Sequence, residues 1–118
     1  MPTTWKGRLL AARILLVTLL GVAALLTAAP APASAATLTT WNRLAHCEST
    51  SRWHINTHNG YYGGLQISRP TWRGYGGRHF ARLPNRATKH EQIRVAERIR
   101  RGQGWGAWPV CSRRIGLR

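Results

Sequence analysis

The chain has 118 residues and a formal net charge of +15, with 18 lysine and arginine residues and only three acidic residues, all glutamate. A field of this sign attracts polyanions such as nucleic acid or an anionic cell wall. The length is enough for one small domain, and we expect binding and chemistry to share one folded unit.

Residues 1–35 are predicted to be a secretory signal peptide. Three basic residues among the first 13 precede an unbroken apolar run from Ile14 to Ala29, and the segment ends in Ala33-Ser34-Ala35. A basic start, an apolar centre and a small-x-small end are typical of such a peptide. The alternative is a membrane anchor, since the run approaches the roughly 20 residues of a spanning helix. Cleavage after Ala35 would leave one domain, residues 36–118, with a formal charge of +12.

The first helix of this domain is predicted to begin at Trp41, with Thr40 as its N-cap. Trp41, Leu44, Ala45 and Glu48 are spaced three or four residues apart. This is the spacing of one face of a helix. Glu48 is therefore expected at the end of an apolar face.

The segment 49–67 has a different pattern. Its short apolar and aromatic pieces are separated by asparagines and glycines, which predicts a small irregular hairpin or three short strands. Ser68, with Pro70 in the following turn, predicts the start of a short second helix that ends at Gly74 or Gly76.

The third predicted helix is the longest. Thr88 and Glu91 have the spacing of a capping box, and Gly102 is the expected stop. Three main helices around a short irregular hairpin make a small α+β domain. The buried side of the long helix is expected to comprise Ile93, Val95, Ala96 and Ile99, and its solvent side Arg94, Arg98, Arg100 and Arg101.

Cys47 and Cys111 are the only cysteines. In an exported chain, two cysteines most simply form one disulfide, and the alternative is two free thiols. The bridge would join the start of the domain to its end. In the chain-entropy model it contributes roughly 4 kcal/mol, which matters because a domain of this size has a small core.

The three carboxylates differ in how well their neighbours explain them. Glu91 is explained by the capping box, and Glu97 by Arg101 one turn further on. Glu48 has no such local explanation. Burial beside apolar groups raises the pKa of a carboxyl group, as a general acid requires at neutral pH. The alternative for Glu48 is a salt bridge with one of the fifteen lysine and arginine residues of the domain.

Aromatic rings and amides are concentrated between residues 53 and 72. Flat rings can stack on sugar faces and amides can bind hydroxyl and acetamido groups, so the pattern is consistent with a glycan cleft. The alternative is that the tryptophans form the core of the domain, which we expect for Trp41 and for one or both of Trp105 and Trp108. The candidate cleft residues are Trp53, Asn56, Asn59, Tyr61, Tyr62, Gln66 and Trp72.

No cofactor and no metal site are expected. His46 and Cys47 are adjacent, and the other histidines form no cluster with the spacing of metal ligands.

Several long, ordered blocks of the sequence resemble the resuscitation-promoting factors of actinobacteria. The resemblance covers nearly all of residues 38–112 and is therefore highly specific. Its blocks are TWNRLAHCES at 40–49, INT at 55–57, NGYYGGLQ at 59–66, Thr71-Trp72, QIRVAER at 92–98 and GAWPVC at 106–111.

The resemblance implies a lysozyme-like transglycosylase domain that acts on peptidoglycan. In that family the glutamate of the Cys-Glu-Ser motif is the catalytic acid, here Glu48. The family's substrate-holding threonine and glutamine correspond to Thr71 and Gln103, and its motif cysteines, here Cys47 and Cys111, form a disulfide. The resemblance also implies a role in the regrowth of dormant cells.

Two departures from the family pattern are notable. Thr50 and Ser51 stand where family members usually carry glycines, so the turn beside the site could differ in shape. Arg69-Pro70 replaces more neutral residues. Neither departure touches Glu48, and both bear on substrate preference rather than on reaction class.

We therefore expect a secreted, wall-associated, monomeric enzyme that cuts the MurNAc-GlcNAc β-1,4 bond. Its expected partners are glycan strands, anionic wall polymers and a partner wall hydrolase, with no nucleic acid and no membrane after signal cleavage. One alternative is a non-catalytic wall-binding or signalling protein. Another is a cationic antimicrobial or nucleic-acid-binding protein, whose binding would be salt-dependent and indifferent to Glu48.

Overall fold

The computed structural model describes residues 34–118, so the predicted signal peptide lies outside the described residues except for its last two positions. Ala35–Arg118 form one compact unit. No helix in the described part of the chain is long and apolar enough to cross a membrane.

The first described helix, α2 (Leu38–Ser49), begins earlier than predicted. Its N-cap is Thr37, whose hydroxyl accepts a hydrogen bond from the Thr40 N–H at 3.2 Å. The prediction of Thr40 as the cap was therefore wrong. The first turn faces solvent, with Leu38 49% exposed, so the apolar spacing that marks a helix in the sequence begins only at Trp41.

The chain after α2 forms a two-stranded antiparallel hairpin, β1 (Tyr61–Tyr62) and β2 (Ile67–Ser68). Tyr61 pairs with Ser68 and Tyr62 with Ile67. A single bridge between Asn56 and Tyr62 adds a third extended piece. The small irregular hairpin predicted for this segment is confirmed.

The short helix α3 (Arg69–Gly74) follows β2 directly, with Ser68 as its N-cap and Pro70 in its first turn, as predicted. Two single turns of 3-10 helix, η1 (Gly77–His79) and η2 (Pro84–Arg86), lead on to the next helix.

The long helix α4 (Lys89–Gln103) has the predicted capping box of Thr88 and Glu91. It ends at Gln103 with Gly104 as its cap, so the predicted stop at Gly102 lies too early. Of the two glycines, only Gly104 has a positive φ, of 71°, a backbone conformation that glycine adopts readily and that cannot continue a helix.

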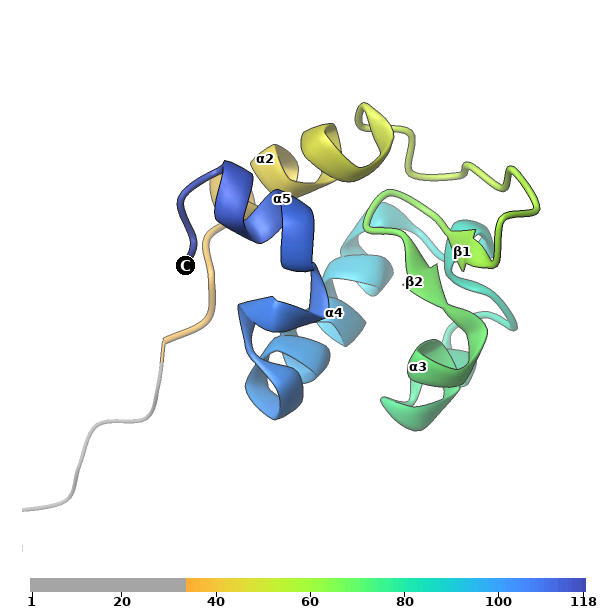
Figure 1. The fold of residues 1–118 in the computed structure, drawn as a ribbon. Coiled ribbons are helices and arrows are strands. Elements are labelled where there is room, and N and C mark those ends of the chain that lie inside the picture. Colours follow the sequence, from red (N-terminus) through yellow and green to blue (C-terminus); the bar gives the residue numbers. More distant parts are fainter. Residues whose placement is uncertain (1–33) are drawn as a thin grey trace, which may run out of the picture. The chain divides into compact units, whose positions relative to one another are not determined.

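After a 3-10 turn, η3 (Trp105–Ala107), the chain forms a last helix, α5 (Pro109–Arg114), which the sequence did not predict. Pro109 is a suitable first residue for a helix. Only Cys111 and Ser112 are buried in it, so it lacks the apolar spacing by which helices are recognised. Figure 1 shows α5 lying beside α2.

The predicted disulfide between Cys47 and Cys111 is confirmed, with a Cα–Cα distance of 5.8 Å. It joins α2 to α5 across a sequence separation of 64 residues. The small α+β domain with one disulfide is confirmed as the fold class.

Tryptophans dominate the core. Trp41 and Trp72 are fully buried and Trp108 is 3% exposed, while Trp105 packs on the core with its ring centroid 5.2 Å from that of Trp41. The other buried apolar residues are Leu44, Ala45, Leu65, Ile67, Ala87, Val95, Ala96, Ile99 and Cys111.

Candidate active site

Glu48 lies in the last turn of α2, next to the disulfide-bonded Cys47. Its side chain is half-buried, and this burial raises the pKa of the Glu48 carboxyl above its ordinary value. Within the part of the chain that the structure describes, no hydrogen bond or ion pair reaches the carboxylate. Glu48 is therefore held by the helix while its carboxyl group remains available.

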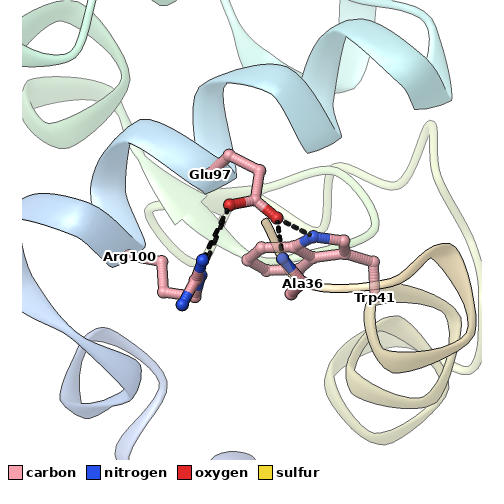
Figure 2. Close-up of polar contacts among 4 residues, drawn as sticks. All are labelled: Ala36, Trp41, Glu97 and Arg100. Carbon is pink, nitrogen blue, oxygen red and sulfur yellow. Dashed lines mark hydrogen bonds and ion pairs between the residues drawn. The ribbon is translucent and has the colours of Figure 1, made fainter. Parts of the chain in front are cut away.

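The other two carboxylates are engaged elsewhere. Glu91 Oε1 accepts the Thr88 N–H at 2.8 Å. Glu97 Oε2 pairs with Arg100 at 3.2 Å, so the prediction of Arg101 as its partner was wrong, because the neighbour three residues on lies closer to this carboxylate. Figure 2 shows that Glu97 Oε1 also accepts hydrogen bonds from the backbone N–H of Ala36 and from Trp41 Nε1, each at 2.8 Å.

A groove of about 460 Å³ opens over Glu48. The hairpin contributes Tyr61 and Gln66 to its lining, and the last part of the chain contributes Trp108 and Arg114. Tyr61 is 51% exposed, so its ring is accessible from solvent. The remaining lining residues are Cys47, Ala107, Pro109, Val110 and Cys111.

A smaller recess of about 60 Å³ adjoins this groove and shares Tyr61, Gln66, Ala107 and Trp108 with it. Thr71 and Gln103 lie in the recess. These two residues come from α3 and from the end of α4. With Glu48 in α2, the family's predicted site positions thus come from three elements and line two hollows that share part of their lining.

Local hydrogen bonds hold the polar lining residues in place. Gln66 has a positive φ of 51° and donates from Nε2 to the Gly63 carbonyl at 3.0 Å. Ser68 Oγ donates to Thr71 Oγ1 at 3.0 Å. The side chains that would face a bound ligand are thus positioned by the hairpin and the start of α3.

Five predicted cleft residues line neither hollow, namely Trp53, Asn56, Asn59, Tyr62 and Trp72. Trp72 is fully buried and donates from Nε1 to the Ala81 carbonyl at 2.8 Å. Trp53 packs on the core, 5.3 Å from the Lys89 ammonium group. Asn59 Oδ1 accepts the Tyr61 N–H at 3.0 Å and so shapes the entry to β1.

Arg114 and Val110 line the groove but were not predicted. Both belong to α5, which has no periodic apolar signal and is joined to α2 by the disulfide. A cysteine followed three residues later by an arginine was the one sequence feature that could have indicated that Arg114 lies on the same helical face as the disulfide.

Gln92 is a fully buried polar residue that the sequence did not single out. Its Oε1 accepts the Gly64 N–H at 3.0 Å, and its Nε2 donates to the carbonyls of Trp53 at 2.8 Å and Ala87 at 3.0 Å. A Cβ on Gly63 would collide with this amide. Gln92 therefore anchors the loop between β1 and β2 to α4.

The turn after Glu48 has a left-handed backbone. Thr50 and Ser51 have φ values of 54° and 60°, the conformation that glycine adopts most easily. Ser49 Oγ donates to the Gly64 carbonyl at 2.9 Å. The end of α2 is thus tied to the hairpin loop, although the turn lacks the glycines that the family pattern carries.

No group of three or more histidine, cysteine, aspartate or glutamate side chains that could hold a metal ion occurs among residues 34–118.

Comparison with known proteins gives a family match. A model of the transglycosylase-like domain matches residues 35–111. The chain is 59% identical over 85 residues to the resuscitation-promoting factor Rpf1 of Corynebacterium glutamicum, an alignment of 72% of this chain and 44% of that protein. It is 53% identical over 87 residues to Rpf of Micrococcus luteus, covering 74% and 38%. With RpfB of Mycolicibacterium smegmatis the identity is 52% over 79 residues, covering 67% and 22%. The chain spans less than half the length of these relatives.

Proposed function

The chain belongs to the transglycosylase-like domain family, and its predicted resemblance to the resuscitation-promoting factors is confirmed; we propose that it is a secreted enzyme that cleaves peptidoglycan, with Glu48 as its catalytic acid. The bond cleaved is the β-1,4 linkage between MurNAc and GlcNAc. By analogy with the names of its relatives, its role is wall remodelling that promotes regrowth. The enzyme acts in the cell wall, beside anionic wall polymers and a partner hydrolase.

The observation that carries this proposal is the environment of Glu48. The carboxyl is half-buried, and no described residue satisfies it with a hydrogen bond or an ion pair. Burial raises the pKa of this group and so favours its protonated form. A protonated carboxyl at the edge of an open groove is suited to donate a proton to a leaving oxygen.

The groove suits a glycan strand. The exposed ring of Tyr61 offers a flat apolar face on which a sugar ring can stack. Gln66, Thr71 and Gln103 offer amide and hydroxyl groups along the hollow for sugar hydroxyls and acetamido groups. Of the aromatic residues predicted for the cleft, the proposal uses Tyr61 alone.

The number of carboxylates indicates the reaction type. Most glycosidases use two carboxyl groups, one as acid and one as nucleophile or base. This chain has three acidic residues, and Glu91 and Glu97 are held by a capping box and by the contacts in Figure 2. Glu48 is then the acid of the first step and the base of the second.

With one carboxylate, the substrate supplies its own nucleophile. Glu48 protonates the glycosidic oxygen, and the bond from that oxygen to C1 of the muramic acid breaks. The acetamido group stabilises the positive charge that develops at C1. The Glu48 carboxylate then takes the proton of the 6-hydroxyl, whose oxygen bonds to C1 and closes a 1,6-anhydro ring. No water is consumed, so the reaction is a lytic transglycosylation, and hydrolysis is its rival if water replaces the 6-hydroxyl.

The masses of the products distinguish lytic transglycosylation from hydrolysis. Purified peptidoglycan is digested with the secreted protein, and the released muropeptides are analysed by mass spectrometry. We expect products with anhydro ends, lighter by one water than hydrolytic products, and a yield lower by about 10²- to 10⁴-fold from a folded Glu48→Gln variant. Products that all carry normal reducing ends would establish a hydrolase instead. No products from a folded wild-type protein would remove the enzymatic proposal.

The formal charge of +12 on residues 36–118 favours a second candidate function, binding to anionic wall polymers without cleavage. Long-range attraction of this kind is screened within roughly 10 Å at 0.1 M salt. Wall binding that falls with salt and is unaffected by Glu48→Gln, together with an absence of cleavage products, would favour this candidate.

A further inference from the structure

The beginning of the domain is tied to α4 through one backbone nitrogen. The N–H of Ala36 donates to Glu97 Oε1 at 2.8 Å, and the same oxygen accepts Trp41 Nε1 at 2.8 Å. In Figure 2 the Ala36 nitrogen and the Trp41 indole point at this oxygen while Arg100 approaches the other. Three parts of the domain thus meet at one carboxylate.

The Glu97 carboxylate is largely shielded from water. Its side chain is 12% exposed, and that of Arg100, with which it forms its ion pair, is 20% exposed. A charged group in such a place depends on its partners, because removing one leaves an uncompensated buried charge. A cation at Oε1 would therefore stabilise Glu97 more than a neutral amide does.

The Ala36 nitrogen is also the atom that the predicted signal cleavage converts from a backbone amide to a free amino group. Hydrolysis by a signal peptidase adds one water across the C–N bond between Ala35 and Ala36. Ala35 leaves as a carboxylate, and the nitrogen of Ala36 becomes an α-amino group. Such groups have a pKa of about 7.7–8.0 and are mostly protonated at neutral pH.

We propose that cleavage between Ala35 and Ala36 creates an ammonium group that forms an ion pair with Glu97 and so completes the mature fold. Before cleavage the donor is a neutral backbone N–H and only the acceptor is charged. After cleavage the donor is a charged ammonium as well, so a direct attraction between two opposite charges is added to the hydrogen bond. The mature domain is therefore more stable than the same domain with residues retained before Ala36.

The geometry makes the proposal specific to one cleavage site. Consecutive Cα atoms lie about 3.8 Å apart, so cleavage one residue earlier or later moves the new charge about one residue away from Glu97 Oε1. Only an N-terminus at Ala36 places the ammonium nitrogen at the observed 2.8 Å. Processing at another site would leave Glu97 with a neutral donor or with none.

The ion pair would also help to hold α2, the helix that carries Glu48, in its position. Trp41 in α2 shares Glu97 Oε1 with Ala36, and Cys47 near the other end of α2 is bonded to Cys111. The two attachments hold α2 near both of its ends.

The test begins with the full chain. It is secreted from an actinobacterial host, and the mass of the product is measured to locate its N-terminus. We expect a product that begins at Ala36. A mature product with any other first residue overturns the proposal.

The second part of the test removes the charge without changing the fold. Residues 36–118 contain a single lysine, Lys89, so a product carrying Lys89→Arg has the α-amino group as its only amine. That group is acetylated in one sample and reductively methylated in a matched sample, which keeps its charge. A change of 1 kcal/mol shifts the Tm of a domain of 60–100 residues by roughly 4–8 °C. We expect acetylation to lower the Tm by about this amount and methylation to lower it less.

A Glu97→Gln variant supplies the control for the pairing. Acetylation should leave its Tm unchanged, because the carboxylate partner is missing. If this variant does not fold, the comparison of acetylated and methylated product with Glu97 intact still decides the question. Equal Tm values for those two samples overturn the proposal.

Discussion

Cys47 and Cys111 join the last turn of α2 covalently to α5, immediately beside Glu48. The same two cysteines line the groove that opens over the Glu48 side chain. The bond therefore connects the helix that carries the acid to the helix that supplies Val110 and Arg114 to the groove.

Reduction of this disulfide should lower stability and activity together. The chain-entropy model assigns roughly 4 kcal/mol to closing a loop of this length, and release of α5 from α2 also loosens the groove. Thermal melting and muropeptide release are measured with and without reductant. A Cys47→Ser/Cys111→Ser variant should not respond to reductant, and free thiols in the secreted product would contradict the prediction.

Glu48→Gln should leave a folded protein whose wall cleavage is lower by about 10²- to 10⁴-fold, because the amide cannot transfer a proton. The matched control is Glu91→Gln. It removes the capping-box carboxylate at the start of α4, should cost about 1 kcal/mol or less and should leave cleavage intact. Wild-type turnover by a folded Glu48→Gln variant would remove Glu48 from the reaction.

The raised pKa of Glu48 predicts the pH dependence of both activity and stability. The folded domain binds the Glu48 proton more tightly than the unfolded chain, so stability falls as pH rises from the ordinary glutamate value through the raised one. The rate of cleavage falls over the same pH range, because Glu48 must be protonated to act as the acid. Denaturation and activity are measured across this range, and a stability profile unchanged by Glu48→Gln would contradict the prediction.

Gln92→Leu should destabilise the domain by about 3 kcal/mol or more. It leaves the Gly64 N–H and the carbonyls of Trp53 and Ala87 without their partner, and each unsatisfied buried group costs about 1–3 kcal/mol. Denaturant titration measures the loss. Gln103→Leu is the matched control, since Gln103 is exposed; it should unfold like the wild type but cleave less well.

Thr50→Gly should raise the free energy of unfolding by about 0.5–1 kcal/mol. The left-handed backbone costs about 1–2 kcal/mol for a residue with a Cβ, and the greater entropy of unfolded glycine offsets part of the gain. Thr39→Gly, at an exposed helical position of α2, should have the opposite sign. A loss of stability in Thr50→Gly would show that the threonine side chain makes a compensating contact.

The sequence by itself determined the features that depend on residues within about one turn of each other. Ser68 with Pro70, and Thr88 with Glu91, marked two helix starts correctly, because a cap is a contact between near neighbours. The single carboxylate without a local partner, Glu48, was identified in the same way. The two cysteines permitted only one intramolecular bridge.

Only the tertiary structure decided what distant segments do to one another. In the structure Trp72 is buried in the core, Gln92 forms hydrogen bonds with three backbone groups, and Arg114 lines the groove. It also joined Glu97 to Ala36, 61 positions away in the chain. Burial and long-range pairing follow from how elements pack, and helical spacing specifies which side of a helix is apolar but not which segment covers it.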